Sequence, residues 1–379
     1  MLFQIGLVPQ LDLLSRLKSL SNIFLVFSLS LLYCIELGAT EKVEDFLSLQ
    51  TRIQEIFETS KLSIVRVKAT RERIENQKTR RLLKMGSGFF VSKDGHVLTT
   101  GLLVNPDRIW IEHDGSFFLA EQVGRDPLCN LSLLKVSEKP KNFNFVSLSD
   151  PPFETPVGSI IVGLTCALEF EVGPTQGLLQ SEEFSFGKRP FPTKMLRTSL
   201  ALGPGEVGAP VFDLQGRFVG ISHAALPDLR SCFLLPAAAC LRIREDLMFS
   251  GEVNYGWFGI TTSRKLNSNS GFDVFVQSLI ENSPAMQSKL KVGDIIRKVG
   301  MHPVTKEGDL AHSAFFARPG TFVEFLVVRD QKELKIPVKV ARRPLAKDKN
   351  ESKDNRIAEV DGVIPEDESF GTSSKVDPK

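Results

Sequence analysis

Few residues in this sequence could carry out hydrolytic chemistry. The chain has five histidines, and His96, His113 and His223 are the three in its first two thirds. Serine-type acyl transfer requires a hydroxyl that attacks, an imidazole that takes its proton and a carboxylate that orients the imidazole. Ser222 stands beside His223, and Asp114 follows His113, but no spacing brings all three groups together. The sequence leaves open a serine, a histidine and an acidic residue that come together only in the folded chain.

The residues around these histidines favour roles other than that of a catalytic base. His96 lies in an apolar, strand-like stretch, which does not favour a role as a base. His113 stands at a polar turn before Gly115, so we expect its ring to be solvated. His223 has two open interpretations, contact with a bound peptide or an ordinary polar residue at a strand end.

The chain is long enough for two or three folded units, because single hydrophobic cores rarely grow to 379 residues. Its apolar share of 42% and charged share of 24% are ordinary for a soluble protein that buries a core. With 47 Lys and Arg against 45 Asp and Glu, the net charge of +2 offers no field that would attract a polyanion. We therefore expect no nucleic acid partner.

The N-terminus has the pattern of an export signal. Arg16 and Lys18 precede the uncharged run 23–35, and the small residues Gly38 and Ala39 follow it. This order predicts a secretory signal over 1–40, and an uncleaved membrane anchor over 19–35 is the alternative. Either one places the protein outside the cytoplasm, in the periplasm or another extracytoplasmic space.

Four cysteines lie beyond this signal, and their spacing matches no zinc-binding pattern: Cys129, Cys166, Cys232 and Cys240. In an oxidising compartment an even number permits disulfides, and buried free thiols are the other interpretation. Both stay open. We expect no metal and no cofactor.

The body of the chain divides by pattern. Apolar residues recur at helical spacing over 41–61, which predicts an amphipathic helix. Over 62–248, short apolar runs alternate with turns rich in Gly, Pro, Asp and Asn, as in a β-barrel or sandwich. The basic stretch 71–81 is predicted to be an exposed loop.

A second unit over 252–343 has the pattern of a small α+β module. It contains predicted strands at 272–276 and 322–328 and a predicted helix near 308–317. Ser283 and Pro284 form a helix start, a cap followed by proline at the first helical position. Beyond it, dense charge and scattered apolar residues predict a solvated tail over 344–379.

Several segments, in order, resemble the HtrA/Deg (protease Do-like) trypsin-type serine proteases. They are GSGFFVSKDGHVLTT at 86–100, DPLCNLSLLKV at 126–136, GPGEVGAPVF at 203–212 and FLLP at 233–236. The second unit resembles a PDZ domain, through GWFGI at 256–260, NSPA at 282–285 and LKVGDII at 290–296. The resemblance spans about 62–343 and implies a mainly β protein, a trypsin-like double β-barrel followed by a PDZ-like domain.

The positions that the resemblance assigns to the catalytic triad carry other residues. The histidine position falls on Leu102, the aspartate position on Asn130 and the serine position on Val207. Leucine has no proton acceptor and valine no nucleophilic atom, so neither a rotamer nor a pKa shift restores the mechanism. We therefore expect no catalytic residue and no peptidase activity.

A vestige of the oxyanion site is expected at the backbone amides of Gly205 and Val207. The neighbouring Glu206 and Ala209 depart from the family's Asn and Gly. Alanine disfavours the backbone angles that glycine adopts, which puts the geometry of this loop in question.

The PDZ-like unit keeps its peptide-binding parts. The resemblance assigns peptide binding to Gly256, Trp257, Phe258, Gly259 and Ile260, with Leu310, Ser313 and Ala314 as the helix wall. Residues 261–263 would form the strand beside which a peptide adds. The alternative is that Trp257 and Phe258 only fill a core between domains.

Two function classes follow. The first is a non-catalytic protein that binds unfolded or C-terminal peptide segments, as adaptor, chaperone or regulator in protein quality control. The second is a serine-type endopeptidase that uses non-standard residues or a partner subunit. The family often trimerises through the segment before its first strand, here 41–61. The resemblance therefore implies a homo-trimer or a mixed oligomer with an active relative.

Overall fold

A computed structural model describes residues 47–75, 78–148, 154–187, 189–266 and 271–344. Residues up to Glu55 and residues from Ile56 onward form two units, and each is described by itself. The predicted signal or anchor over 1–40 and the predicted tail beyond position 344 lie outside the described residues. Within the described ranges, no helix is long and apolar enough to cross a membrane.

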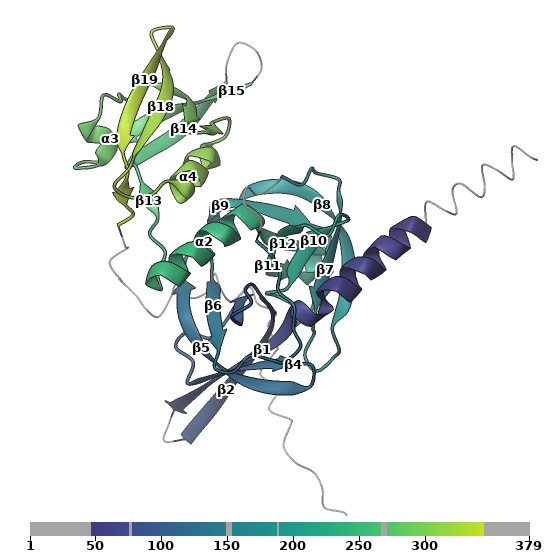
Figure 1. Cartoon of the computed structure of the whole chain (residues 1–379). Helices are drawn as coiled ribbons and strands as arrows, with labels where there is room; N and C mark the ends of the chain where they lie inside the picture. Colours follow the sequence, from purple (N-terminus) through teal and green to yellow (C-terminus); the bar gives the residue numbers. More distant parts are fainter. Residues whose placement is uncertain (1–46, 76–77, 149–153, 188, 267–270, 345–379) are drawn as a thin grey trace, which may run out of the picture. The chain divides into compact units, whose positions relative to one another are not determined.

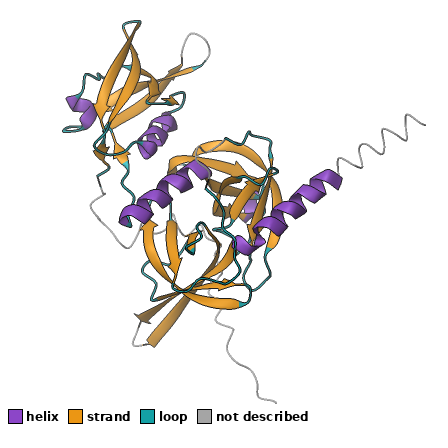
Figure 2. Cartoon of the chain, in the orientation of Figure 1, coloured by secondary structure: helices purple, strands orange, loops and turns teal. Residues whose placement is uncertain are grey.

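The predicted N-terminal helix is present from 47 to 60, and its predicted start at 41–46 is not among the described residues. A short 3-10 turn, η1 (Lys61–Ser63), follows it. Strands dominate the rest of the described chain (Figures 1 and 2), which confirms the predicted mainly β class.

Two closed six-stranded barrels follow one another along the chain. The first has the strand order β1-β2-β3-β6-β5-β4 and the second the order β10-β11-β12-β9-β8-β7. The first contains β1 (Ile64–Glu75), β2 (Lys78–Phe90), β3 (His96–Thr100), β4 (Arg108–His113), β5 (Ser116–Asp126) and β6 (Leu131–Val136). The second contains β7 (Ile160–Thr165), β8 (Gly173–Phe186), β9 (Arg189–Thr198), β10 (Pro210–Asp213), β11 (Phe218–Leu226) and β12 (Ser231–Pro236), with a 3-10 turn η2 (Pro227–Leu229).

Each barrel closes around its own apolar core. Val65, Val97 and Leu134 are among the buried side chains of the first barrel. Ile161 and Leu234 are among those of the second. Alternate residues of a strand point to one face, so the short apolar runs of the sequence supply these inward-facing positions.

The prediction of an exposed loop over 71–81 is wrong. β1 and β2 pair in one antiparallel ladder from Ile64 opposite Phe89 to Glu75 opposite Lys78. The side chains of Arg71 and Glu72 are exposed on this hairpin. A two-stranded ribbon satisfies its backbone hydrogen bonds within itself, so its side chains can be charged.

Helix α2 (Ala237–Ser250) follows the second barrel and was not predicted. It opens with three alanines, which favour helix over other conformations. It ends at Gly251, whose φ of 73° is left-handed and whose amide donates to the carbonyl of Leu247 at 2.9 Å.

The C-terminal part contains a sheet in the order β14-β15-β16-β18-β19, with β17 paired to β16. Its strands are β14 (Ile260–Leu266), β15 (Phe272–Leu279), β16 (Ile295–Val299), β17 (His302–Pro303), β18 (Phe322–Arg329) and β19 (Lys332–Lys339). A separate pair joins β13 (Gly256–Trp257) to β20 (Ala341–Arg342), and the helices are α3 (Pro284–Gln287) and α4 (Glu307–Phe316). In the part of the chain that the structure describes, β14 pairs with β15 alone, so β14 is an edge strand of this sheet.

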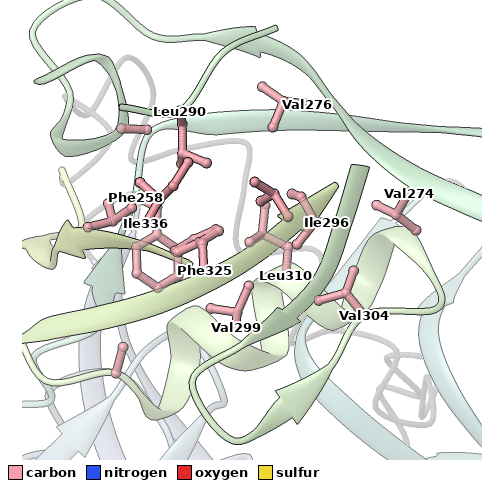
Figure 3. Close-up of a cluster of buried hydrophobic side chains, with 14 of the residues drawn as sticks. Phe258, Val274, Val276, Leu290, Ile296, Val299, Val304, Leu310, Phe325 and Ile336 are labelled. Atoms are coloured by element: carbon pink, nitrogen blue, oxygen red, sulfur yellow. The ribbon is translucent and has the colours of Figure 1, made fainter. Parts of the chain in front are cut away.

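The core of this C-terminal part lies between the sheet and α4. Figure 3 shows Phe258, Leu310 and Phe325 pointing into it, and the rings of Phe258 and Phe325 meet edge to face at 5.0 Å. Ser283 caps α3 as predicted, its hydroxyl accepting a bond from the Met286 amide at 3.2 Å.

Candidate functional site

A cavity of about 230 Å³ opens among the loops of the two barrels. Leu102, Gly205 and Val207 all line it, although Leu102 lies more than a hundred residues before the other two in sequence. The fold therefore gathers at one place two of the three positions that the resemblance assigns to the triad, together with the predicted oxyanion loop.

Leu102 follows the end of β3 and belongs to the core of the first barrel. Its side chain is only 6% exposed and packs with the buried aliphatic cluster of that barrel. The amide of the preceding Gly101 donates to the carbonyl of Asn130 at 3.3 Å. This bond places the Asn130 segment beside the cavity, although Asn130 itself does not line it.

Asn130 holds a left-handed conformation, with φ of 48°, which asparagine tolerates better than most residues. Its Oδ1 accepts a hydrogen bond from Nη2 of Arg125 at 2.9 Å. A carboxamide at this position can accept a hydrogen bond, but it carries no charge with which to stabilise an imidazolium.

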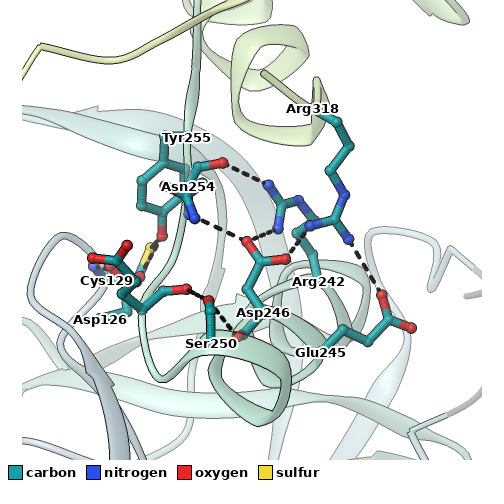
Figure 4. Close-up of polar contacts among 10 residues, drawn as sticks. Asp126, Cys129, Arg242, Glu245, Asp246, Ser250, Asn254, Tyr255 and Arg318 are labelled. Atoms are coloured by element: carbon teal, nitrogen blue, oxygen red, sulfur yellow. Dashed lines mark hydrogen bonds and ion pairs between the residues drawn. The ribbon is translucent and has the colours of Figure 1, made fainter. Parts of the chain in front are cut away.

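The segment before Asn130 is held by a buried carboxylate (Figure 4). Asp126 accepts the amides of Leu128 and Cys129, each at 3.1 Å, and the phenol of Tyr255. Burial raises the pKa of the Asp126 carboxyl, and these donors oppose the rise. The same view shows Asp246 of α2, which accepts from Arg242 and Arg318.

Val207 sits in a loop fixed at both ends. The amide of Ser87 donates to the Val207 carbonyl at 3.0 Å, and the amide of Gly208 donates to the Ser222 carbonyl at 2.9 Å. Gly208 has φ of 96°, and a Cβ there would lie 2.1 Å from the Ser87 carbonyl oxygen. Glycine is therefore required at position 208.

The predicted concern about Ala209 is wrong. Ala209 does not have a positive φ, and the left-handed positions of the loop are Gly205, at 82°, and Gly208. Its amide donates to the hydroxyl of Ser222 at 2.9 Å. Glu206 accepts the hydroxyl of Thr165 at 2.7 Å and the amide of Gly203, so its carboxylate holds the loop from inside.

The amides of Gly205 and Val207 stay available. In the described part of the chain, neither donates a hydrogen bond to another protein group. Free backbone amides that line a cavity can donate to a carbonyl oxygen.

The cavity is lined mainly by apolar side chains. Among its described lining residues there is no His, Ser, Cys, Asp or Glu. The two hydroxyls belong to Thr99, which donates to the Ser87 carbonyl at 2.8 Å, and Thr100, which donates to the Ser222 carbonyl at 3.1 Å. Lys84 is the ionisable group of the lining.

The histidines lie away from this cavity. His96 Nδ1 and the hydroxyl of Ser92 are 2.8 Å apart, but Ser92 belongs to the turn before β3, His96 is the first residue of β3, and neither lines the cavity. His223 stands at a bulge of β11 and does not line it either, whereas Ala225 and Pro227 do. The sequence did not identify these two residues as lining the cavity.

The prediction that His113 is solvated is wrong. His113 ends β4, is 5% exposed and packs its ring 5.5 Å from that of Phe90. Burial lowers the pKa of this imidazole. The residues before His113 form strand β4, and His113, the last residue of that strand, lies on its inward face.

The four described cysteines are buried free thiols, which decides between the two interpretations left open. Burial raises the pKa of Cys232 and of Cys240 to about 12. Thiols with such values carry almost no thiolate near neutral pH and are inert nucleophiles.

A second cavity, of about 300 Å³, lies between the start of β14 and α4. Gly256, Trp257, Phe258, Gly259, Ile260 and Leu310, the predicted peptide-binding residues, all line it. Ala314 also lines it, as predicted, but Ser313 does not, because its hydroxyl turns back to the Asp309 carbonyl at 2.7 Å. Glu307 and Ala311 line it and were missed.

Phe258 is therefore both a core residue and part of this groove. It is 3% exposed and belongs to the core of the C-terminal part, so its packing role does not exclude contact with a ligand. Gly259 has φ of 77°, and a Cβ there would lie 2.1 Å from Ser283 Cβ. The close approach of the loop to Ser283 explains this glycine.

Comparison with known families identifies both parts. Residues 86–221 match the trypsin-like peptidase domain, and residues 256–340 match the PDZ domain. A probable periplasmic serine endoprotease, DegP-like, from Ectopseudomonas mendocina is 29% identical over 273 residues, 69% of this chain and 57% of the relative. A protein of the same name from Bartonella henselae is 27% identical over 74% of this chain and 57% of its own length.

The chain thus spans somewhat more than half the length of these relatives. Among solved structures, the HtrA-type protease AlgW with a decapeptide has a TM-score of 0.61 at 19% identity, covering 78% of this chain and 99% of that one. A serine endoprotease from Yersinia pestis has a TM-score of 0.54 at 21% identity, covering 77% of this chain and 98% of that one. The fold is a trypsin-like domain followed by a PDZ domain, as in HtrA structures, which confirms the predicted architecture.

Proposed function

We propose that this chain is an exported HtrA-like protein that binds unfolded or C-terminal polypeptide segments without cleaving them. It would act as an adaptor, chaperone or regulator in protein quality control. The name of its relatives, periplasmic endoproteases, supports an extracytoplasmic location.

The observation that carries the proposal is the content of the barrel cavity. Leu102 and Val207 present hydrocarbon where a base and a nucleophile would be required. Removing either group costs about a millionfold in turnover in subtilisin, and what survives comes from binding and the oxyanion site. Here both are absent from the lining, together with the anion that would orient the base.

What remains in the cavity suits binding. Its aliphatic lining can accept an apolar side chain, and the amides of Gly205 and Val207 can donate hydrogen bonds to a peptide carbonyl. Because the carbonyl would meet no attacking group, the bound peptide stays intact.

The PDZ groove supports the same proposal. β14 offers an open edge to an extended peptide, and the groove beside it is floored by Phe258, Ile260 and Leu310. Main-chain bonding along such an edge, with side chains entering the groove, is a known mode of peptide recognition. The relative AlgW has been solved with a decapeptide and with a tripeptide.

The alternative is an active serine-type endopeptidase, since the relatives are named serine endoproteases. Lys84 and the hydroxyls of Thr99 and Thr100 are the groups that such an activity would have to use within this chain. Both hydroxyls donate to backbone carbonyls, and Thr100 is 3% exposed, which opposes their use as nucleophiles. A partner subunit that completes the site is the other form of this alternative.

Assembly through the segment 41–61, into a homo-trimer or a mixed oligomer with an active relative, is part of the proposal. A chain that lacks this segment is expected to elute from gel filtration at a lower mass than the exported part of the protein. An unchanged mass would oppose this role.

One sample can test binding and cleavage together. A fluorescent peptide with a free carboxylate and an apolar last residue is titrated with the purified chain, and the recovered peptide is weighed by mass spectrometry. We expect saturable anisotropy and an intact peptide. Fragments would favour the endopeptidase, and an unchanged anisotropy at all concentrations would overturn the proposal.

A further inference from the structure

Two opposite charges line the PDZ groove. Glu307 and Arg343 are both exposed, and both belong to the lining of the 300 Å³ cavity. Within the described ranges, neither forms an ion pair with another residue, and they do not pair with each other. Each charge is therefore available to a ligand in the groove.

Arg343 marks the end of the groove that receives a carboxylate. It directly follows β20, which pairs with β13 so that Arg342 stands opposite Gly256. The amide of Arg343 donates to the Tyr255 carbonyl at 2.9 Å, beside the first residue of the glycine-flanked loop. A cation there complements the negative charge of a peptide's C-terminus.

Glu307 marks the other end. It is the first residue of α4, and the last turn of that helix lies against Gly256, where a Cβ would stand 2.7 Å from the Ala314 carbonyl oxygen. The seven steps along the helix from Glu307 to Ala314 span about 10 Å at the helical rise. An extended peptide covers the same length in about three residues.

On the other side of the groove, strand β14 presents every second residue to the ligand. Ile260 and Thr262 of β14 line the cavity and Thr261 does not, so alternate residues of the strand face it. Thr262 and Glu307 thus flank the part of a bound peptide that precedes its C-terminal carboxylate.

Nearby charges are engaged elsewhere. Asp309 accepts the amides of Thr305 and Lys306, at 2.7 and 2.8 Å. The ammonium of Lys306 lies over the ring of Phe184, and the guanidinium of Arg264 lies over the ring of Phe272. Glu307 is the one acidic residue in the described lining of the groove, and it faces the upstream part of a bound peptide.

We infer that the groove selects peptides with a free C-terminal carboxylate, an apolar last residue and a lysine or arginine two or three residues before it. This inference rests on the proposed peptide binding and adds the charge pattern of the ligand. The cationic residue pairs with Glu307, and the carboxylate gains from Arg343 in addition to the loop amides.

The test uses the full chain and a set of labelled octapeptides that end in valine. A single lysine is moved through the five residues before the valine, and matched peptides carry glutamine or glutamate instead. We expect the tightest binding with lysine two or three residues before the valine, and glutamate there to weaken binding about fivefold, as for an exposed ion pair. Raising the salt to about 1 M should remove most of this preference.

Two variants assign the effect to its residues. Glu307→Lys should reverse the preference, so that the glutamate peptide binds more tightly than the lysine peptide. Arg343→Gln should weaken a free-acid peptide about threefold and leave its C-terminal amide unchanged. Glu333→Lys, an exposed change on β19 outside the groove, serves as the control and should alter none of these ratios.

The outcomes separate this inference from the proposed function. Saturable binding of all peptides with equal affinity, unaltered by Glu307→Lys, would overturn the charge pattern and leave peptide binding standing. The absence of binding by every peptide would overturn both.

Discussion

At the scale of single residues, Leu102 and Val207 give the barrel cavity hydrocarbon at two of the three positions assigned to the triad. Leu102 belongs to the first barrel's core, and Val207 is held by the bond from Ser87 to its carbonyl. The Oδ1 of Asn130 accepts a hydrogen bond from Arg125. Gly205 and Gly208 give this loop its two left-handed positions, while Leu102 and Val207 supply no hydroxyl, imidazole or carboxylate.

Gly208 is expected to be the residue of this loop least tolerant of change. Gly208→Ala adds a Cβ against the Ser87 carbonyl oxygen and forces an L-residue into a positive φ. Gly216→Ala is the matched control, because φ there is 77° and a Cβ would meet nothing within 4 Å. The control should cost about 1–2 kcal/mol in the free energy of unfolding. Gly208→Ala should cost on the order of 2 kcal/mol more, as measured by urea denaturation, and equal losses would contradict the account.

His113 is expected to make stability depend on pH. Burial holds its pKa in the folded chain below the ordinary value of about 6.5. Between those two values the unfolded chain binds a proton that the folded chain does not, so acid favours unfolding. Stability should therefore fall as the pH drops from 7.5 to 5.5.

The variant His113→Leu removes this titration and fills similar space. Its loss of unfolding free energy over the same pH interval should be smaller than that of the wild type. The loss should not vanish, because burial also lowers the pKa of His96, His302 and His312, the last to about 4. An identical pH slope in the two proteins would refute the role of His113.

At the scale of elements, the PDZ groove is made by an edge strand and a helix with small residues facing it. Ala311 is exposed on α4 and lines the groove. Ala311→Trp should fill the groove and weaken binding of a free-carboxylate peptide at least about tenfold, since the ring occupies the place of the ligand's side chain. The midpoint of thermal unfolding should hardly change.

Ala311→Ser is the matched control, because it alters polarity without bulk. It should bind the peptide as the wild type does. Undiminished binding by Ala311→Trp would show that the peptide docks elsewhere.

Most strands could be predicted because their residues are short apolar runs between turn formers, and this local signal suffices. The hairpin of β1 and β2 was missed because its outer residues are charged, and ribbon pairing has no apolar signature. α2 was missed because only its alanines and Gly251 identify it, without a clear apolar stripe.

The site could be predicted in part for a similar reason. Gly205, Val207 and the loop 256–260 lie in recognisable motifs, and the structure places them in the two cavities. The inward orientation of His113 and the contributions of Glu307, Ala311 and Arg343 depend on strand facing and on helix orientation. These become visible only when the elements are assembled.

At the scale of the whole molecule, the described chain combines a barrel cavity whose lining holds no His, Ser, Cys, Asp or Glu with a groove lined by Phe258, Ile260 and Leu310. The two sites are built on different folds, a double barrel and an α+β module. Under the proposed function, the protein holds polypeptides and leaves cleavage to a partner.

Covalent trapping tests this claim most directly. The purified chain is exposed to a fluorophosphonate probe and, separately, to unfolded casein, with a DegP-like endoprotease treated in parallel. Since the described lining of the barrel cavity offers no serine and no imidazole, we predict no labelled chain and intact casein while the parallel enzyme is labelled and cleaves. Label mapped by mass spectrometry to a hydroxyl of this chain, together with casein fragments, would contradict the account.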